Sequence, residues 1–464
     1  MNKLYFIIGS QDLYGEECLK QVAKDGREMT EFLNSALKNT EIVLLPTVET
    51  SDICVKNIRQ ANCDDECVGV ITWMHTFSPA KMWIKGLKEL NKPLLHLHTQ
   101  ANEKLPYDSI DMDFMNLNQS AHGDREYGFI LARMRIKHAV VAGYYRHASV
   151  VAKIQRFCDV AGAIAYSNKL KVATFGNNMR EVAVTDGDRV QSQIDYGWEV
   201  NYYGLGDLVR LIDKASDADV DKKMEEYAGK YTMATENIAA VREQAKYEVG
   251  LEKFIEKTGI GAFTDTFQDL HGLKQLPGLA VQNLMTKGIG FGPEGDYKIS
   301  ALSAVLVKMA ENKEGATGFI EDYTYDLTEG EELELASHML EVPPAFAASK
   351  PEIQVHPLGI GGKDDPARLV FDGVTGDGIQ VTLVDMGNRF RIVCADIELV
   401  KQPKPMPKLP VARIMYRLKP DFATGSAKWC EAGGAHHSVV STALTREDIA
   451  LFARLTGTEA IFIG

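Results

Sequence analysis

Short apolar runs alternate with amphipathic stretches along the first third of the chain. Strands are predicted at Leu4–Ile8, Glu41–Leu45, Val68–Trp73, Leu94–His98 and His138–Ala142. Helices are predicted between them, at about residues 16–36, across 53–61, from Ser78-Pro79 onward and after His122. Alternating strands and helices indicate a parallel sheet with helices on its faces.

The Ser78-Pro79 pair has the residues of a helix start. A serine oxygen can accept a hydrogen bond from an unpaired backbone N–H, and proline at the first helical position loses no hydrogen bond. The preceding segment Trp73–Phe77 is then expected at the carboxyl end of a strand. In open α/β sheets, ligands bind at that edge.

A second αβ pattern begins near Leu170. It has a predicted strand at Lys171–Phe175 and predicted helices at Asp219–Tyr231, Ile238–Lys257 and Tyr297–Met309. From Gly315 the pattern changes to short strands separated by turns, which is typical of an antiparallel barrel or sandwich.

Asp377-Gly378 is a good turn signal in this last region. It lies between the apolar runs Arg368–Phe371 and Gln380–Val384, so a hairpin is predicted there. A late helix at Thr445–Leu455 and a strand at Ala460–Ile463 complete the chain.

Length and charge narrow the class of protein. A chain of 464 residues corresponds to about three domains. The 51 basic and 64 acidic residues give a net charge of −13, which argues against a nucleic-acid surface and favours a small-molecule substrate.

The apolar run Leu4–Ile8 is too short for the core of a signal peptide, and no stretch approaches the ~18 apolar residues of a membrane helix. We therefore expect a cytoplasmic protein. The seven cysteines are irregularly spaced, which indicates reduced thiols. Cys63 and Cys67 could form half of a zinc site, but no second pair lies nearby in the sequence, so this interpretation is disfavoured.

Two glutamates and two histidines in polar or glycine-rich settings are the candidate metal ligands: Glu294, Glu321, His338 and His437. Carboxylate oxygen and imidazole nitrogen together suit Mn²⁺, Co²⁺ or Zn²⁺ and do not suit an all-oxygen calcium site. Glu294 has the alternative of a helix-start acid that interacts with the helix dipole. Period-2 alternation places Glu321 on an inward strand face with Tyr323 and Tyr325, with a solvated face as the alternative.

His338 taken alone is more typical of a structural histidine than of a ligand. The pair His436-His437 is a stronger signal because it follows Gly433-Gly434-Ala435, where the backbone can approach closely. The two adjacent imidazoles point in different directions. One can therefore bind a metal while the other contacts substrate.

Three further segments have weaker signals. Gly288, Gly290 and Gly292 follow a predicted helix rather than a strand, so a loop leading to Glu294 is favoured over a dinucleotide site. The polar segments Ser10–Tyr14 and Asn116–His122 suit a ligand rich in hydroxyl groups, with ordinary turn chemistry as the alternative.

Long collinear motifs identify a family resemblance. They are Gly9–Gly15, Trp73–Trp83, Asp111–Gln119, Asn178–Asp188, Asp269–Gly278, Glu294–Asp296, Glu321–Tyr325, Ser337–Glu341 and Ala432–His437. Over essentially its whole length the chain resembles the bacterial L-arabinose isomerases. Chains of that family tend to run somewhat beyond the position of Gly464, which would affect C-terminal packing and none of the predicted ligands.

The resemblance implies two Rossmann-like αβ domains, at residues 1–168 and 169–314, followed by a C-terminal antiparallel β-barrel domain at 315–464. It implies a homotrimer or homohexamer with active sites shared between subunits. It also implies a metal, usually Mn²⁺ with Co²⁺ or Mg²⁺ as possible substitutes, held by Glu294, Glu321, His338 and His437. No nucleotide cofactor is expected.

Carried over by position, Glu294 and Glu321 are the expected catalytic residues. The expected substrate contacts are Gln11, Leu13, Tyr14, Phe77, Gln119, His122, Met179, Thr264, Phe267 and His436, with Gln119 and His122 contributed by a neighbouring subunit. The expected reaction converts L-arabinose to L-ribulose through an enediolate, and D-galactose to D-tagatose as well.

Residue chemistry supports the same reaction. Moving a carbonyl from C1 to C2 of a sugar needs a base, an acid and a positive charge beside the developing oxyanion, and a metal-bound pair of carboxylates supplies all three. Two alternatives stay open at this stage. One is an isomerase of another sugar such as L-fucose, and the other is a non-catalytic sugar-binding protein.

Overall fold

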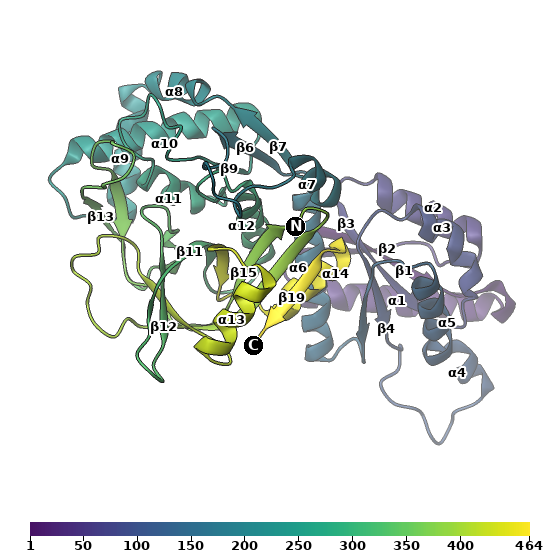
Figure 1. Cartoon of the computed structure of the whole chain (residues 1–464). Coiled ribbons are helices and arrows are strands. Elements are labelled where there is room, and N and C mark those ends of the chain that lie inside the picture. Colours follow the sequence, from purple (N-terminus) through teal and green to yellow (C-terminus); the bar gives the residue numbers. More distant parts are fainter. The chain divides into compact units, whose positions relative to one another are not determined.

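The computed structural model describes residues 1–464 (Figure 1). The chain forms two compact units. The first comprises Met1–Ala165 with Leu451–Gly457, and the second comprises Tyr166–Ala450 with Thr458–Gly464. None of the helices combines the length and the apolar character that a membrane crossing requires.

The first unit is built on a five-stranded parallel sheet in the order β2-β1-β3-β4-β5. Its strands are β1 (Asn2–Gly9), β2 (Thr40–Leu44), β3 (Cys67–Met74), β4 (Leu94–His98) and β5 (Ala139–Ala142). The accompanying helices are α1 (Glu16–Ala36), α2 (Ser51–Cys63), α3 (Ile84–Glu89), α4 (Met112–Leu117), α5 (Ser120–Arg133) and α6 (Ala148–Ser167), with 3₁₀ turns η1 (Asp12–Tyr14) and η2 (Ala80–Trp83). The predicted parallel sheet is confirmed.

Alternate residues of β1 enter two different cores. Leu4, Phe6 and Ile8 pack into one cluster of buried side chains, while Tyr5 and Ile7 pack into another. Successive side chains of a strand point to opposite faces, so both faces of this sheet are covered. This explains why its strands read as continuous apolar runs rather than as alternating ones.

Two helix starts differ from prediction. The Ser78 hydroxyl accepts a hydrogen bond from the Trp83 indole N–H at 3.1 Å and caps no helix. The chain continues from Pro79 through the 3₁₀ turn η2 before α3 begins. Helix α5 begins at Ser120, so His122 lies within its first turn rather than before it. A nearby indole donor at Trp83 outcompetes the local capping bond at Ser78.

The second unit contains a four-stranded parallel sheet in the order β10-β9-β6-β7. Its strands are β6 (Lys171–Phe175), β7 (Glu199–Tyr203), β9 (Ala262–Thr264) and β10 (Gly290–Phe291). The helices around it are α7 (Arg189–Tyr196), α8 (Leu205–Asp213), α9 (Asp217–Lys230), α10 (Ile238–Thr258), α11 (Leu279–Met285) and α12 (Tyr297–Met309). Helix α12 is buried along nearly its whole length.

Six antiparallel strands of this unit close into a barrel in the order β15-β18-β11-β12-β17-β16, because β16 also pairs with β15. They are β11 (Thr317–Asp326), β12 (Leu333–Ser337), β15 (Gly376–Asp385), β16 (Phe390–Val400), β17 (Ile414–Leu418) and β18 (His437–Ser441). The other elements of this region are β8 (Thr232–Met233), η3 (Pro344–Phe346), β13 (Glu352–Val355), β14 (Ala367–Val370), α13 (Phe422–Ala432) and β19 (Glu459–Ile463). Helix α14 (Arg446–Thr456) begins in this unit and belongs to the first unit from Leu451 onward. The predicted fold class, two αβ sheets followed by a β-barrel, is confirmed.

The predicted hairpin at Asp377-Gly378 is wrong. Both residues lie inside β15, whose hairpin partner is β16. The preceding run forms β14, which pairs with β13 in a separate three-stranded sheet with β8. A turn signal is local, whereas the choice of partner strand depends on contacts that are distant in sequence.

Candidate metal centre and sugar pocket

The barrel strands bring three of the four predicted metal ligands together. In the antiparallel pairing, Glu321 on β11 stands opposite His437 on β18 and, on its other side, opposite Ser337 on β12. His338 directly follows Ser337. Three residues that are up to 116 positions apart in the sequence therefore meet across adjacent strands.

The fourth predicted ligand, Glu294, lies in the loop between β10 and α12. Its backbone has a φ of 60°, a left-handed conformation that is costly for a residue other than glycine, and the next residue Gly295 has a φ of 82°. A Cβ atom on Gly295 would lie 2.6 Å from the Cα of Asn178. The Met179 N–H donates to the Glu294 carbonyl at 3.0 Å. The loop is thus held in a strained shape by tight packing.

Two imidazoles form the buried floor of the cluster. His338 is 1% exposed and His437 is fully buried. The His338 Nε2 lies 3.6 Å from the Glu321 Oε2, and the His437 Nε2 lies 3.8 Å from the Glu294 Oε2. The edge of the buried Phe319 ring packs against both imidazoles, with ring centroids 5.6 Å away in each case.

Neither of these Nε2 atoms has a hydrogen-bond partner. Buried polar atoms are nearly always paired, so two unpaired nitrogens that face two carboxylates indicate a site for a shared partner. A divalent cation fits this donor set, since imidazole nitrogen and carboxylate oxygen both bind Mn²⁺, Co²⁺ and Zn²⁺. The side chains of Glu294 and Glu321 are 12% and 15% exposed, so the acids lie at the mouth of the site.

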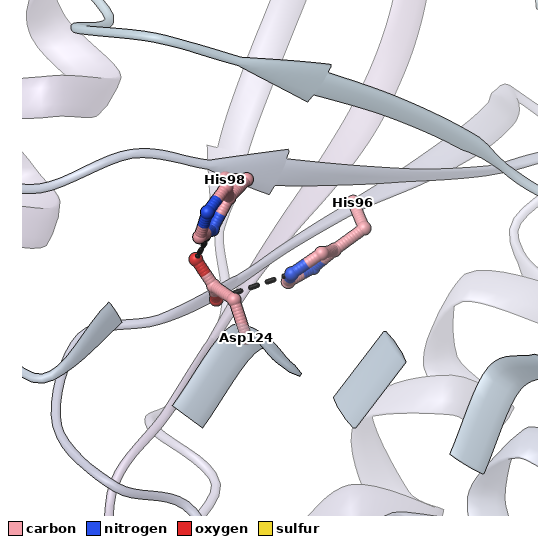
Figure 2. A group of neighbouring side chains, drawn as sticks. All are labelled: His96, His98 and Asp124. Atoms are coloured by element: carbon pink, nitrogen blue, oxygen red, sulfur yellow. Dashed lines mark hydrogen bonds and ion pairs between the residues drawn. The ribbon is translucent and has the colours of Figure 1, made fainter. Parts of the chain in front are cut away.

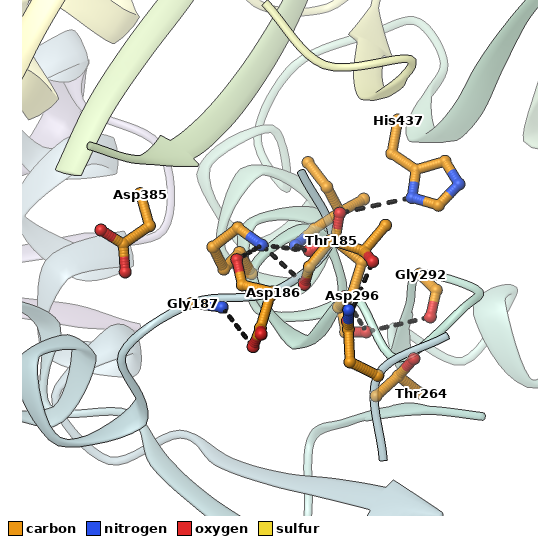
Figure 3. Close-up of polar contacts among 12 residues, drawn as sticks. Thr185, Asp186, Gly187, Thr264, Gly292, Asp296, Asp385 and His437 are labelled. Carbon is orange, nitrogen blue, oxygen red and sulfur yellow. Dashed lines mark hydrogen bonds and ion pairs between the residues drawn. The ribbon is translucent and has the colours of Figure 1, made fainter. Parts of the chain in front are cut away.

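A second carboxylate orients each imidazole from behind. The His338 Nδ1 is 2.5 Å from the Glu341 Oε2, and the His437 Nδ1 is 3.3 Å from the Asp296 Oδ2, as Figure 3 shows for the latter pair. A hydrogen bond at Nδ1 keeps Nε2 free to bind a metal and fixes the plane of the ring. Both predicted histidine ligands therefore have the arrangement of metal-binding imidazoles.

Asp296 is in turn held by a buried lysine. It is the N-cap of α12, and its carboxylate accepts from the Ile299 N–H at 3.2 Å and from the Lys298 ammonium at 3.0 Å. Lys298 is fully buried, and its Nζ also donates to the carbonyls of Thr185 and Asp186 at 2.9 and 2.8 Å. Three acceptors therefore satisfy the three N–H donors of this ammonium.

The charges of the cluster perturb several pKa values. Burial alone would lower the pKa of His338, but the Glu341 carboxylate and the other acids outweigh it and raise the pKa to about 9. Burial would raise the pKa of Glu294, yet the neighbouring imidazoles of His436, His437 and His338 lower it. The pKa of Asp296 is lowered because Lys298 and His437 outweigh its burial. Glu294 and Asp296 are therefore ionised near neutral pH.

The period-2 prediction for β11 is wrong beyond Asp322. The pairing shifts from Asp322 opposite Ala336 to Thr324 opposite Leu335, so Tyr323 is the extra residue of a β-bulge. Tyr323 and Tyr325 are 52% and 48% exposed and do not share a buried face with Glu321.

Asp322 turns away from Glu321, as predicted. Its carboxylate accepts hydrogen bonds from the Tyr416 hydroxyl and from the Gln380 amide, each at 2.6 Å. This acid is therefore engaged by two neighbouring side chains of the barrel.

One group of three residues beside this cluster could also hold a metal ion. It consists of Glu294, His436 and His437, whose ligand atoms all lie within 4.8 Å of one another. This group contains His436, predicted as a substrate contact, in place of Glu321 and His338. The His436 Nε2 lies 3.7 Å from the Glu294 Oε2, and its side chain is 36% exposed.

Four of the predicted substrate contacts belong to this second unit. The Phe267 ring stacks on His338 with centroids 5.9 Å apart, and Thr264 ends β9 as a buried residue. Met179 is bonded through its backbone to Glu294, and His436 lies beside the same acid. Phe267, Met179 and His436 therefore adjoin the metal-type cluster.

The other six predicted contacts belong to the first unit and form a cluster of their own. The Gln119 amide donates to the Tyr14 hydroxyl at 2.9 Å, and the His122 ring stacks on Phe77 with centroids 4.3 Å apart. The Gln11 amide donates to the Phe77 carbonyl at 3.0 Å, and Leu13 is 79% exposed. A stacked imidazole beside amide and phenol groups is suited to a sugar.

Sequence reasoning missed Glu341, Asp296 and Lys298 as parts of the site. A usable signal existed for Glu341, which lies three residues after His338, and for Asp296, which directly precedes a helix. No local signal marks Lys298 as buried, because two of its three acceptors are the carbonyls of Thr185 and Asp186, more than a hundred residues earlier in the chain.

Three family models match the chain in succession. They describe the L-arabinose isomerase N-terminal domain at residues 1–169, the central domain at 171–312 and the C-terminal domain at 316–459.

Curated relatives agree with these models. An L-arabinose isomerase of Halalkalibacterium halodurans is 51% identical, with 99% of this chain and 93% of that protein covered. An L-arabinose isomerase of Shouchella clausii is also 51% identical, with 99% and 94% covered.

Among solved structures, a periplasmic sugar-binding protein of an ABC sugar transporter from Legionella pneumophila is 11% identical and covers 66% of this chain and 94% of its own. Its TM-score of 0.14 carries no argument about this fold. The family models and the full-length relatives show that this chain belongs to the L-arabinose isomerase family.

Proposed function

We propose that this enzyme converts L-arabinose to L-ribulose at a divalent metal ion held by Glu294, Glu321, His338 and His437. The observation that carries the proposal is the pair of buried, unpartnered imidazole nitrogens that face two carboxylates at 3.6 and 3.8 Å. Family membership supports the reaction and the substrate. A plain sugar-binding protein would have no need for this arrangement.

The two glutamates are assigned the proton transfer. Isomerisation removes the proton from C2, delivers a proton to C1 and moves a hydroxyl proton between the two oxygens. Glu294 and Glu321 lie on different elements and are both partly exposed, so one can take the C2 proton while the other serves the oxygen atoms. When bound, a divalent cation polarises the sugar oxygens at C1 and C2 and stabilises the enediolate.

Protonation states support this division of roles. The pKa of Glu294 is lowered by the imidazoles around it, so this acid begins the reaction as a carboxylate and can act as a base. An acid for the second transfer must then gain its proton from the substrate during turnover. The assignment of base and acid between Glu294 and Glu321 stays open, and reversal of the reaction exchanges the roles.

The surrounding side chains orient the imidazoles and limit access of water. Glu341 and Asp296 hold the Nδ1 atoms of His338 and His437, while Phe319 and Phe267 cover the rings with apolar surface. His436 is partly exposed beside Glu294, where its imidazole can donate to a sugar hydroxyl. The ring planes are thereby set before substrate arrives.

We propose Mn²⁺ as the ion, with Co²⁺ or Mg²⁺ as possible substitutes. Two carboxylates and two imidazoles form a donor set of intermediate softness, which Mn²⁺ and Co²⁺ satisfy better than Mg²⁺. We also propose that D-galactose is converted to D-tagatose at the same site, because it shares the configuration of L-arabinose at the reacting carbons.

We further propose a homotrimer or homohexamer in which Gln119 and His122 of one subunit complete the site of another. Their cluster with Tyr14 and Phe77 is preassembled in the first unit and includes the exposed Leu13. The proposed domain division is 1–168, 169–314 and 315–464, and the three family-model matches have similar bounds.

The test is metal removal and return. The purified enzyme is stripped with EDTA, and Mn²⁺, Co²⁺ or Mg²⁺ is added back separately before ketose formation is measured from L-arabinose, D-galactose and L-fucose. We expect no turnover without metal, full recovery with Mn²⁺ and the highest kcat/KM on L-arabinose. Undiminished turnover after complete metal removal would overturn the proposal, and a preference for L-fucose would overturn the substrate assignment.

A further inference from the structure

A second histidine–carboxylate cluster lies in the first unit. His96 and His98 are alternate residues at the carboxyl end of β4, and Asp124 approaches them from α5 (Figure 2). The His96 Nε2 is 3.1 Å from the Asp124 Oδ1, and the His98 Nδ1 is 2.6 Å from the Oδ2. The carboxyl edge of a parallel sheet is where α/β folds bind ligands.

His96 has an unusual hydrogen-bond balance. Its side chain is 3% exposed, and its Nδ1 is 3.2 Å from the Thr72 hydroxyl, which donates to the Leu95 carbonyl at 3.4 Å. The Nδ1 is then the donor toward Thr72, so a neutral ring has a bare lone pair on Nε2. This Nε2 makes no hydrogen bond despite the carboxylate 3.1 Å away.

A lone pair that faces a carboxylate oxygen is repelled by it. The arrangement therefore requires one positive charge between the His96 Nε2 and Asp124, and either a second proton on the ring or a metal ion can supply it. A proton on Nε2 would lie in the plane of the ring and point outward from it, and in this orientation it forms no hydrogen bond to Asp124. A cation beside the N···O line satisfies both atoms.

Asp124 has no other cationic partner. It is 3% exposed, its ion pairs are with the two imidazoles, and its Oδ1 also accepts from the Met74 N–H at 3.0 Å. A buried carboxylate without lysine or arginine is costly unless a cation or several donors neutralise it.

We propose that His96, His98 and Asp124 bind a divalent transition-metal ion, Zn²⁺ or Co²⁺ in chemical class, in the first unit. Two imidazoles and a carboxylate form a common ligand set for these ions. Ligand atoms that each lie roughly 2.1 Å from one ion are about 3.0 Å apart in an octahedral site and about 3.4 Å apart in a tetrahedral one, so the 3.1 Å between His96 and Asp124 falls within this range. The His98 ring must move outward by a few tenths of an ångström, which its exposure to solvent allows.

Such an ion would join β4 to the start of α5. Helix α5 is already attached to the sheet by the Ser120 hydroxyl, which donates to the Met74 carbonyl at 3.0 Å. The residues next to this point, Gln119 and His122, are the ones expected to reach the neighbouring active site. A metal at Asp124 would stabilise the helix that presents them. Its ligands are distinct from those of the proposed catalytic metal centre, which all belong to the second unit.

The test counts bound ions. Metal-free full-length protein is titrated with Co²⁺, and bound metal is measured by elemental analysis and by visible absorption, with Zn²⁺ as competitor. The chains compared are the wild type, His98→Gln, His437→Gln and the double variant. We expect two, one, one and no tightly bound ions, respectively.

His147→Gln is the matched control, because His147 is an exposed histidine of the same unit that pairs with Glu103 at 3.1 Å. This variant should still bind two ions. One ion in the wild type, retained in His98→Gln and lost in His437→Gln, would overturn the second site and leave the proposed catalytic centre intact. Conversely, His437→Gln that retains both ions would count against the catalytic centre alone.

A direct measurement on the wild type covers the case in which His98→Gln does not fold. Crystals grown with Zn²⁺ should give an anomalous peak beside the His96 Nε2 and Asp124. A crystal with zinc at the barrel cluster and none at His96 would contradict the proposal.

Discussion

The two histidine–carboxylate clusters of this chain use the same kinds of donor and are spaced differently. In the barrel, the imidazole nitrogens stand 3.6 and 3.8 Å from the facing carboxylate oxygens. In the first unit the corresponding distances are 3.1 and 2.6 Å. The barrel cluster of Glu294, Glu321, His338 and His437 is therefore open, with imidazoles and carboxylates beyond hydrogen-bond distance. In the His96 cluster, formed by His96, His98 and Asp124, the imidazoles lie within direct contact of the carboxylate.

The difference comes from what stands behind each imidazole. In the barrel, Glu341 and Asp296 hold the Nδ1 atoms, so the rings cannot collapse onto the facing acids. In the first unit one carboxylate, Asp124, faces both rings, and only the Thr72 hydroxyl holds His96 from behind. An open, preorganised site pays less to bind an ion than one that must first break its own hydrogen bonds.

The largest expected effect is loss of proton transfer in the open cluster. Glu294→Gln should lower kcat by roughly 10³-fold, since an amide can act neither as the base nor as the acid of the proton transfer, and proton-transfer groups contribute about 10²–10⁴-fold. Steady-state kinetics at saturating Mn²⁺ measure this, and circular dichroism checks the fold. Residual activity within tenfold of the wild type would remove Glu294 from the chemistry.

The next largest effect concerns the supports behind the imidazoles. Lys298→Met should weaken Mn²⁺ binding by roughly 10–100-fold, because Asp296 loses its counter-charge and no longer orients His437. Titration of metal-free enzyme gives the affinity, and excess Mn²⁺ should restore most of kcat. The matched control is Lys308→Met on the same helix, where the lysine pairs only with Glu311 at the surface. Equal affinities in the two variants would mean that the buried support has no role.

A smaller effect is the order of loading. The open cluster should bind Co²⁺ at a free concentration about tenfold or more below that needed by the His96 cluster. In the His96 cluster, binding must first separate His98 from Asp124. His437→Gln and His98→Gln isolate each site for separate titration. If the His96 cluster binds more tightly, then preorganisation does not decide affinity in this protein.

The smallest expected effect is a pH dependence of folding stability that comes from Glu334, a buried acid of the barrel without a cationic partner. Glu334 is 3% exposed, its Oε1 has no hydrogen-bond partner, and burial together with the nearby Asp322 raises its pKa to about 9. The folded protein keeps this proton and the unfolded chain releases it near its ordinary pKa. The contribution of Glu334 to the free energy of unfolding is therefore fully present below pH ~4.5 and is lost as the pH rises toward 9.

Thermal unfolding of metal-free protein between pH 5 and 9 measures this decline. Glu334→Gln, which cannot ionise, should flatten the pH dependence and raise the unfolding midpoint above the wild-type value at pH 8–9, where the wild type has lost this contribution. Parallel curves for the variant and the wild type would show that Glu334 is ionised in the folded state.

Sequence patterns alone identified the parallel sheets and several element bounds, and together with the family motifs they predicted the residues of the open cluster. Alternating apolar runs and helices imply a covered parallel sheet, and the predicted bounds of β6 and α12 coincide with those observed. Local hydrophobic periodicity suffices for this because it depends on neighbouring residues. The candidate ligands followed from donor chemistry and from long family motifs.

Only the tertiary structure determined which residues and strands pair with one another. In the folded chain, Trp83 donates a hydrogen bond to Ser78, and Tyr323 is the extra residue of a β-bulge. Strand β14 pairs within a separate sheet, and the buried Lys298 pairs with Asp296. It also brought His96, His98 and Asp124 together with a nitrogen that no protein group satisfies. These outcomes depend on hydrogen bonds and charges between residues far apart in the chain, and no local pattern encodes such partners.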